Sequence, residues 1–238
     1  MAQVSSATVR SPYVLKTQPH SSHSILQRLL PEKGEGRRLL DVGCANGDLS
    51  RLFCERGYCV TGIDSCERPA VGFSETIDFF TVDLDSGLPK MEGAFDYIIC
   101  ADVLEHLYDP HILLRDLRVK LAPGGKLIAS LPNSGNIYFR ASVLMGRFPS
   151  HDRGLFDRTH LHFYMWEGWK KLLRAHGFHI QSIEPSAIPF SLMTPRTPRI
   201  GEVLESAYML AARAWKTMFA YQFLVVATEA RNHPRVNS

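Results

Sequence analysis

The amino-acid sequence predicts an α/β domain built on a doubly wound, mostly parallel sheet. From residue 37 onward, short apolar runs typical of strands alternate with segments in which apolar residues recur every three or four positions. Glycine and proline separate many of these segments. Such alternation implies parallel strand pairing through right-handed crossovers, so we expect one open sheet with helices on both faces.

The individual elements follow from local patterns. Apolar runs predict strands over 39–42, 59–63, 79–82, 95–100, 126–131, 178–183 and 219–227. Helical spacing predicts helices near 25–30, 48–56, 110–121, 138–144, 165–176 and 201–216. Asp109 before Pro110 is typical of a helix N-terminus, whereas Gly57 and Gly177 each predict a helix end. Four prolines predict a loop over 185–200.

Length and charge limit the classes of protein. A chain of 238 residues suits one large domain, which we assign to 23–238, after a flexible tail over 1–22 that is rich in Ser, Thr, Pro and Gln. A transit peptide is the alternative for this tail, but its few basic residues and its prolines favour the flexible tail. The net charge of +3 gives no reason to expect nucleic-acid binding.

The cysteines and the hydropathy pattern bear on location. Five cysteines without paired spacing predict free thiols rather than disulfides or a metal centre. No apolar run is long enough to predict a transmembrane segment. We therefore expect a cytoplasmic protein, and the sequence leaves its oligomeric state open.

The turn after the first predicted strand is the strongest functional signal. Asp41 lies at the end of that strand, where a carboxylate can hold an ammonium or hydroxyl group. The turn itself contributes four residues that we assign to a cofactor site: Gly43, Cys44, Ala45 and Gly47. Glycine lets the backbone approach a ligand closely, and the helix N-terminus that follows offers free N–H groups. The spacing differs from the G-x-G-x-x-G of NAD-binding proteins, which makes an NAD enzyme a weak alternative.

Polar residues also follow the next predicted strands. Asp64, with Ser65 behind it, comes about 20 residues after the glycine turn, where a carboxylate suits both ribose hydroxyls. Asp83 and Leu84 follow the third strand, and Ala101 and Asp102 the fourth. The carboxyl ends of parallel strands meet at one edge of the sheet, so we assign all six to the same cofactor site. Asp96 lies early in its strand and is expected to have a structural role.

Five motifs in order resemble the class I S-adenosylmethionine-dependent methyltransferases. They occupy 37–47, 61–64, 82–85, 95–107 and 121–127. The first resembles D-x-G-x-G-x-G with Ala45 in place of the middle glycine. The resemblance implies a Rossmann-like seven-stranded sheet with an antiparallel last strand, a substrate cap inserted at 133–164, and S-adenosylmethionine as cofactor. It also implies that Asp83 accepts a hydrogen bond from the adenine amino group and that Leu84 packs on the ring.

Two histidines are candidates for a general base. Asp102, Glu105 and His106 follow the fourth strand, and we expect Asp102 to share a helical face with Glu105 or His106. These three residues would also be the place for a divalent cation, although two carboxylates and one histidine are not a specific signature, so we expect no metal. Helix capping is the plain alternative for Asp102 and His106.

The second histidine lies in an Asp-Arg-Thr-His segment over 157–160. If that stretch is extended, His160, His162 and Tyr164 share one face. His160 is then a base candidate, while Asp157 and Arg158 position the cap or an acidic substrate group. The alternative is an internal salt bridge with a satisfied histidine. Aromatic residues of the cap either line an acceptor pocket or form the core of the cap; those considered are Tyr138, Phe139, Phe148 and Phe156, together with Arg140.

These observations predict methyl transfer from S-adenosylmethionine to a small-molecule or lipid- or glycan-linked acceptor, with O-methylation as the leading chemistry. The overall pattern is similar to ubiquinone-biosynthesis-like and methionine-biosynthesis-associated methyltransferases. One alternative is a non-catalytic cofactor-binding partner of another enzyme. A nucleic-acid methyltransferase is less favoured, because the motif typical of that class is absent where the chain reads Ala-Asp-Val-Leu over 101–104.

Overall fold

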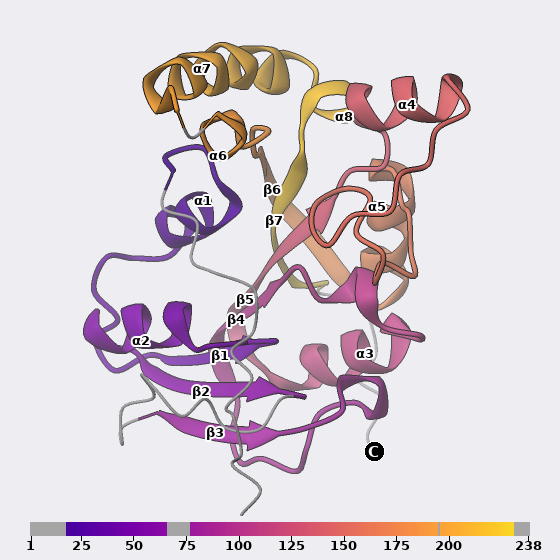
Figure 1. The fold of residues 1–238 in the computed structure, drawn as a ribbon. Helices are drawn as coiled ribbons and strands as arrows, with labels where there is room; N and C mark the ends of the chain where they lie inside the picture. The colour runs from indigo at the N-terminus through magenta and orange to yellow at the C-terminus, as the bar shows by residue number, and fades with distance from the viewer. Residues whose placement is uncertain (1–17, 66–76, 195, 231–238) are drawn as a thin grey trace, which may run out of the picture.

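The computed structural model describes residues 18–65, 77–194 and 196–230 (Figure 1). Seven strands form one sheet: β1 (Arg38–Val42), β2 (Cys59–Asp64), β3 (Asp78–Thr81), β4 (Phe95–Ala101), β5 (Leu121–Pro132), β6 (Phe178–Pro185) and β7 (Gln222–Glu229). Their order is β3-β2-β1-β4-β5-β7-β6. The first five strands pair in parallel, whereas β7 runs antiparallel to both β5 and β6. The doubly wound fold with an antiparallel last strand is thus confirmed.

Helices cover both faces of the sheet (Figure 1). The elements α1 (Ser22–Leu29), α2 (Asp48–Glu55) and α7 (Pro198–Ala214) pack on one face, and α3 (Pro110–Lys120) and α5 (Trp166–Ala175) on the other. The remaining α-helices of the described residues lie at one end of the molecule, namely α4 (Ile137–Leu144), α6 (Phe190–Met193) and α8 (Lys216–Phe219). Two single 3₁₀ turns, η1 (Leu84–Ser86) and η2 (Leu104–His106), follow β3 and β4.

Alternation along the central strands divides the core into two halves. Leu39 faces the α1–α2–α7 side, and the next residue, Leu40, faces the α3–α5 side; both are fully buried. Ile98 and Ile99 divide in the same way on β4. Because successive side chains of a strand point to opposite faces, a continuous apolar run is what a sheet covered on both faces requires. Trp169 is fully buried and donates its indole N–H to the carbonyl of Pro132 at 2.8 Å.

Two expected polar roles are confirmed. The Asp109 carboxylate accepts a hydrogen bond from the His111 amide at 2.9 Å and so caps α3, with Pro110 at the first helical position. Asp96 accepts from the backbone N–H of Arg38 at 2.9 Å, which ties β4 to β1 away from the cavity described below. Its structural role follows from this contact.

Two expectations about the second half are wrong in part. The prolines of 185–200 do not mark a continuous loop, because α6 begins after Pro189 and Pro198 opens α7. Proline is well tolerated in the first turn of a helix, where its missing N–H would have no partner. The last strand begins at Gln222 and not at Phe219, since Phe219 ends α8.

Two further observations concern the chain as a whole. The predicted tail over 1–22 lies largely outside the described residues, and its described part leads directly into α1, where Ser21 caps the helix by accepting from the Ser24 amide at 3.3 Å. Among the described residues, none of the helices combines the length and the apolar character that crossing a bilayer requires.

Candidate active site

A cavity of about 750 Å³ opens at the carboxyl ends of the parallel strands. The strand order reverses between β1 and β4, so the crossovers on either side of this point run in opposite directions. The divergence of the flanking connections leaves a crevice there, which is where open α/β sheets bind their ligands. Of the residues assigned above to the cofactor site and to catalysis, all except Gly47 line this cavity: Asp41, Gly43, Cys44, Ala45, Asp64, Ser65, Asp83, Leu84, Ala101, Asp102, His106 and His160.

The glycine turn is held in a left-handed conformation by its neighbours. Gly43 has a φ of 69°, and a Cβ atom at this position would lie 2.5 Å from Cγ2 of Val103, so both backbone and space require glycine. Ala45 also adopts a positive φ, of 49°, which is unfavourable for alanine. The Asp64 carboxylate accepts from the Ala45 amide at 2.7 Å and fixes that conformation. Gly47, with a φ of 74°, is the N-cap of α2 and acts on the site through the helix it starts.

Asp41 lies directly before the glycine turn and is almost fully buried from solvent. Its side chain is 2% exposed and accepts a hydrogen bond from Oγ of Ser50 on α2 at 2.6 Å. Burial raises the pKa of Asp41 to about 7; the Ser50 hydrogen bond opposes this shift, and the nearby Asp64 carboxylate adds to it. The sequence predicts that Asp41 binds an ammonium or hydroxyl group of a ligand. In the structure, the hydroxyl group that it binds is that of Ser50.

The residues after β3 form a compact turn at the edge of the cavity. The Asp83 carboxylate caps η1 by accepting from the Asp85 amide at 3.1 Å. Asp85 in turn accepts from the Tyr108 amide at 2.7 Å, which joins this turn to the segment before α3. Leu84 is 7% exposed and faces both the core and the cavity.

The expectation that Asp102 shares a helical face with Glu105 or His106 is wrong. Asp102 precedes η2 and has a φ of 55°, so it is not part of a helix. Its carboxylate accepts hydrogen bonds from Nε2 of Gln222, at 2.7 Å, and from Oγ of Ser130. A single left-handed residue redirects the side chain toward β5 and β7, which spacing along the chain does not reveal.

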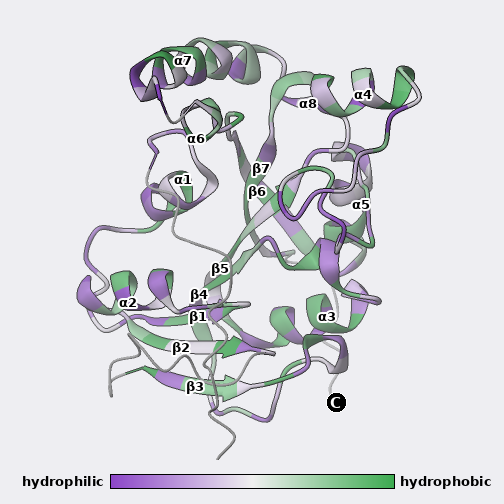
Figure 2. Cartoon of the chain, in the orientation of Figure 1, coloured by the Kyte–Doolittle hydropathy of each residue, from purple (hydrophilic) through white to green (hydrophobic). Residues whose placement is uncertain are grey.

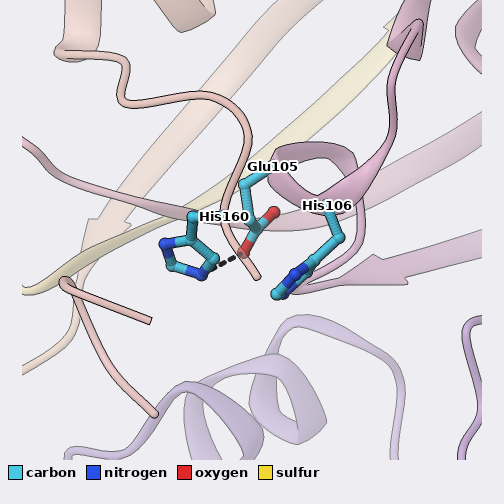
Figure 3. A group of neighbouring side chains, drawn as sticks. All are labelled: Glu105, His106 and His160. Carbon is cyan, nitrogen blue, oxygen red and sulfur yellow. Dashed lines mark ion pairs between the residues drawn. The ribbon is translucent and has the colours of Figure 1, made fainter. Parts of the chain in front are cut away.

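Glu105 and His106 instead meet His160 from the segment between β5 and α5 (Figure 3). The His106 and His160 rings have centroids 4.7 Å apart, and Nε2 of His160 lies 3.9 Å from Oε1 of the fully buried Glu105. The potential ligand atoms of the three residues all lie within 4.8 Å of one another. Among the described residues, the side chains that could bind a divalent cation are therefore Glu105, His106 and His160. The predicted set contained Asp102 in place of His160.

Burial, together with the neighbouring His106, lowers the pKa of His160 to about 4. Asp157 and Asp102 act in the opposite direction and limit this shift. His160 is therefore neutral near pH 7, and its depressed pKa makes it a poor proton acceptor. Of the two predicted bases, His106 is the better suited.

A hydrogen-bond network orients the His106 ring. Nδ1 of His106 lies 3.2 Å from the carbonyl oxygen of Thr159 and 2.9 Å from its Oγ1. A carbonyl oxygen only accepts, so Nδ1 carries the proton and donates it. Thr159 Oγ1 donates its own hydrogen to the buried Asp157 carboxylate at 2.6 Å. This assignment leaves Nε2 of His106 with the lone pair, as a general base requires.

The carboxylate in this network is held in its charged form. Burial alone would raise the pKa of Asp157, but side-chain and backbone hydrogen bonds from Thr159, together with His160 and His106, lower it overall. The adjacent Arg158 points away and forms an exposed ion pair with Asp152 at 3.3 Å. Asp157 thus positions Thr159, whereas Arg158 does not line the cavity.

The aromatic residues considered for an acceptor pocket form a separate cluster. Phe139 and Phe156 stack at 4.4 Å, and Phe148 packs edge-on against Phe156 at 5.2 Å. Neither these residues nor Tyr138 and Arg140 line the cavity. The alternative of a small aromatic core holds for Phe139 and Phe156, which are buried, but not for Phe148 and Tyr138, which are exposed. The alternation over 160–165 is also confirmed, since His160, His162 and Tyr164 are half-buried while Leu161 and Phe163 are exposed.

Several cavity residues carry no recognisable sequence signal. They come from the start of the described chain (Gln18, His23), the β5–α5 segment (Arg153, Gly154, Leu155), α6 and the residue before it (Pro189, Leu192), and the start of β7 (Tyr221, Gln222). Each lies far in sequence from the glycine turn, and only tertiary packing brings them together. Burial raises the pKa of the Tyr221 hydroxyl to about 12, and a Cβ on Gly154 would lie 2.4 Å from that hydroxyl oxygen.

Comparison with known proteins identifies the family of this chain. A family model described as a methyltransferase domain matches residues 15–183. The chain belongs to the methyltransferase domain family. A ubiquinone biosynthesis O-methyltransferase from Idiomarina loihiensis is 33% identical over 105 residues, which cover 41% of this chain and 43% of that protein. A protein of the same description from Pseudomonas aeruginosa is 32% identical over 105 residues and 45% of its length. The matched part thus spans less than half of these relatives.

Solved structures show the same fold for the methyltransferase domain. An S-adenosylmethionine-dependent methyltransferase from Mesorhizobium loti superposes with a TM-score of 0.61 at 23% identity, covering 86% of this chain and 96% of that one. Magnesium protoporphyrin IX methyltransferase from Synechocystis, solved with bound S-adenosylhomocysteine, gives a TM-score of 0.52 at 19% identity, covering 82% and 75%. The domain is a class I S-adenosylmethionine-dependent methyltransferase domain.

Proposed function

We propose that this chain transfers the methyl group of S-adenosylmethionine to an oxygen atom of a small-molecule or lipid- or glycan-linked acceptor. The observation that carries the proposal is His106, whose Nδ1–H is committed to Thr159, leaving Nε2 to accept a proton inside the cavity. A hydroxyl acceptor must lose its proton during the transfer, so a positioned base is useful there. The names of the ubiquinone biosynthesis relatives support oxygen as the acceptor atom.

The cofactor is assigned along the carboxyl ends of the strands. Asp64 and Ser65 after β2 would hold the ribose, and Asp83 and Leu84 after β3 the adenine. The turn from Gly43 to Ala45 would approach the cofactor closely, because no side chain larger than a methyl group stands at either position. Cys44 is part of that turn, Asp41 and Gly47 flank it, and Ala101 and Asp102 would border the sulfonium end of the cofactor.

The transfer itself is an in-line displacement. When bound, S-adenosylmethionine would supply a methyl group activated by its sulfonium, with the neutral thioether S-adenosylhomocysteine as the by-product. Nε2 of His106 would accept the proton that the acceptor hydroxyl loses as its oxygen takes up the methyl group. Since the methyl donor is already activated, alignment supplies most of the rate and the base supplies a smaller factor.

Two measurements on the same preparation test the proposal. Stabilisation by S-adenosylhomocysteine in a thermal-shift assay measures cofactor binding, and transfer of labelled methyl groups into a metabolite and lipid extract measures activity. We expect both, with the label in an ether or ester. Tight cofactor binding without any methylated product would instead support a non-catalytic partner of another enzyme. Label found only in amines would remove the O-methylation.

A further inference from the structure

The exposed apolar side chains of this protein are unevenly distributed. Among the described residues, eleven large apolar side chains are more than half exposed, and ten of them lie in two segments, 137–165 and 190–216. The first segment contributes Leu144, Met145, Phe148 and Met165. The second contributes Leu192, Met193, Ile200, Val203, Leu210 and Trp215. Scattered exposed apolar residues are ordinary, but a concentration of this kind marks a contact surface.

The same two segments carry an excess of positive charge. They contain eight Arg and Lys residues against four Asp and Glu residues, which gives a formal charge of +4, more than the +3 of the whole chain. The basic residues are Arg140, Arg147, Arg153, Arg158, Arg196, Arg199, Arg213 and Lys216, and all eight are exposed. Two of the four acidic residues, Asp157 and Glu205, are buried. The exposed apolar side chains therefore stand among basic ones.

Hydrogen bonds from the N-cap of α4 hold this helix beside α7 and α8. Nδ2 of Asn136, the residue that caps α4, donates to the Tyr208 hydroxyl on α7 at 3.0 Å and to the carbonyl of Phe219 in α8 at 3.2 Å. The helices α4, α7 and α8 accordingly lie at the same end of the molecule in Figure 1. Figure 2 shows hydrophobic residues along α4 and α7 at this end. We call the exposed residues of these two segments the apolar–basic surface.

The apolar side chains of α7 follow a helical face. Ile200, Val203 and Leu210 are spaced three and seven residues apart and are all exposed, whereas Gly201, Glu205, Met209 and Ala212 face the protein. An amphipathic helix normally turns its apolar side inward. In α7, apolar residues lie on the outer side as well. Because these outer residues are exposed, no helix or strand of the described residues packs on that side of α7.

The apolar–basic surface adjoins the cavity of the candidate active site. Arg153 and Leu155 from the first segment line that cavity, and so does Leu192 from the second, which is itself 54% exposed. Both segments therefore contribute to the lining of the cavity that also contains His106, so a molecule held at this surface lies next to that cavity.

We propose that the apolar–basic surface docks on an anionic lipid bilayer and receives a lipid-carried acceptor from it. The docking stands on exposure and charge, and only the acceptor rests on the proposed methyl transfer. Apolar side chains enter the boundary between headgroups and acyl chains while arginine and lysine contact anionic headgroups. A second copy of the chain fits less well, because it would bring two surfaces of like charge together.

Vesicle flotation of the full chain tests the docking. We expect the protein to float with vesicles that contain phosphatidylglycerol and phosphatidylcholine, to bind pure phosphatidylcholine more weakly, and to lose binding as salt is raised. The paired substitution Leu144→Glu and Met145→Glu should weaken binding to the mixed vesicles at least about tenfold, as should Val203→Glu with Leu210→Glu. The matched control is Tyr108→Glu, because Tyr108 is 81% exposed and lies outside both segments.

The outcomes separate the alternatives. Retained stabilisation by S-adenosylhomocysteine shows that each variant is folded, so loss of flotation then reports the surface alone. Absence of flotation for the unaltered chain, or equal flotation of all variants, overturns the proposal. A dimer in solution that the same substitutions dissociate would assign the surface to a second copy instead. Flotation without any methyl transfer would leave the docking intact and contradict only the proposed function.

Discussion

Nδ1 of His106 lies 2.9 Å from Oγ1 and 3.2 Å from the carbonyl oxygen of Thr159, and this pair of contacts fixes the proton on Nδ1. We expect His106→Gln to lower kcat by about 100-fold, the usual contribution of a positioned base, while the Kd for S-adenosylhomocysteine changes little. Thr159→Val should cost less, because the backbone carbonyl still orients the ring. Steady-state kinetics and calorimetry separate the two effects; unchanged kcat in His106→Gln would remove the base from the mechanism.

His160 is expected to affect acid stability. Its folded-state pKa of about 4 lies below the ordinary value of 6.5. Between these two pH values, His160 is therefore protonated in the unfolded chain but neutral in the folded protein. The associated stability is fully present above pH 6.5 and is lost as the pH falls toward 4. His160→Gln should flatten the free energy of unfolding over this range, measured by urea titration at several pH values. His179→Gln, at an exposed position on β6, is the control and should leave the slope unchanged.

Asp41 should show the opposite dependence. Because its folded-state pKa is raised from 3.8 to about 7, the folded protein holds a proton that the unfolded chain releases, and stability falls as the pH rises between these values. Asp41→Asn keeps an acceptor for Ser50 without the buried charge. We expect it to stabilise the cofactor-free protein at pH 8 by up to about 3 kcal/mol, and much less at pH 4. An equal gain at both pH values would contradict the shifted pKa.

Asp64 has two separable roles that two substitutions distinguish. Asp64→Asn keeps an oxygen for the Ala45 amide, whereas Asp64→Ala removes it and releases the left-handed Ala45. We expect both to weaken S-adenosylhomocysteine binding. The Kd of Asp64→Ala should exceed that of Asp64→Asn by up to about tenfold, since a lost hydrogen bond between neutral groups costs about 0.5–1.5 kcal/mol. Isothermal titration measures this; an unchanged Kd in both variants would contradict the ribose assignment.

A chelator tests the expectation that no metal is required. Methyl transfer from a sulfonium needs no Lewis acid, so turnover should survive prolonged treatment with EDTA, and metal analysis should find no stoichiometric ion. Loss of turnover that Mg²⁺ or Zn²⁺ restores would instead assign the ion to Glu105, His106 and His160, whose ligand atoms lie within 4.8 Å of one another. Glu105→Gln would then reduce the affinity for that ion.

Local sequence patterns predicted most of the sheet and many of the residues that line the cavity. Leu39 to Gly47 and the acidic residues at 64 and 83 each lie at the end of a parallel strand, and parallel strands necessarily bring their carboxyl ends to one edge. The residues at 190–193 and 219 were wrongly expected to be loop and strand, because their conformation depends on packing of α6 and α8 rather than on their own propensity.

The sequence by itself determined the methyl donor and the mostly parallel sheet, because ordered motifs and the alternation of apolar runs with helical spacing are properties of neighbouring residues. Only the tertiary structure decided which distant residues complete the cavity. It placed His160 beside Glu105 and His106, turned Asp102 toward Gln222 through one left-handed residue, and brought α4 beside α7. These contacts link residues up to 120 positions apart. No periodicity along the chain encodes such contacts, since they depend on where loops return to the sheet.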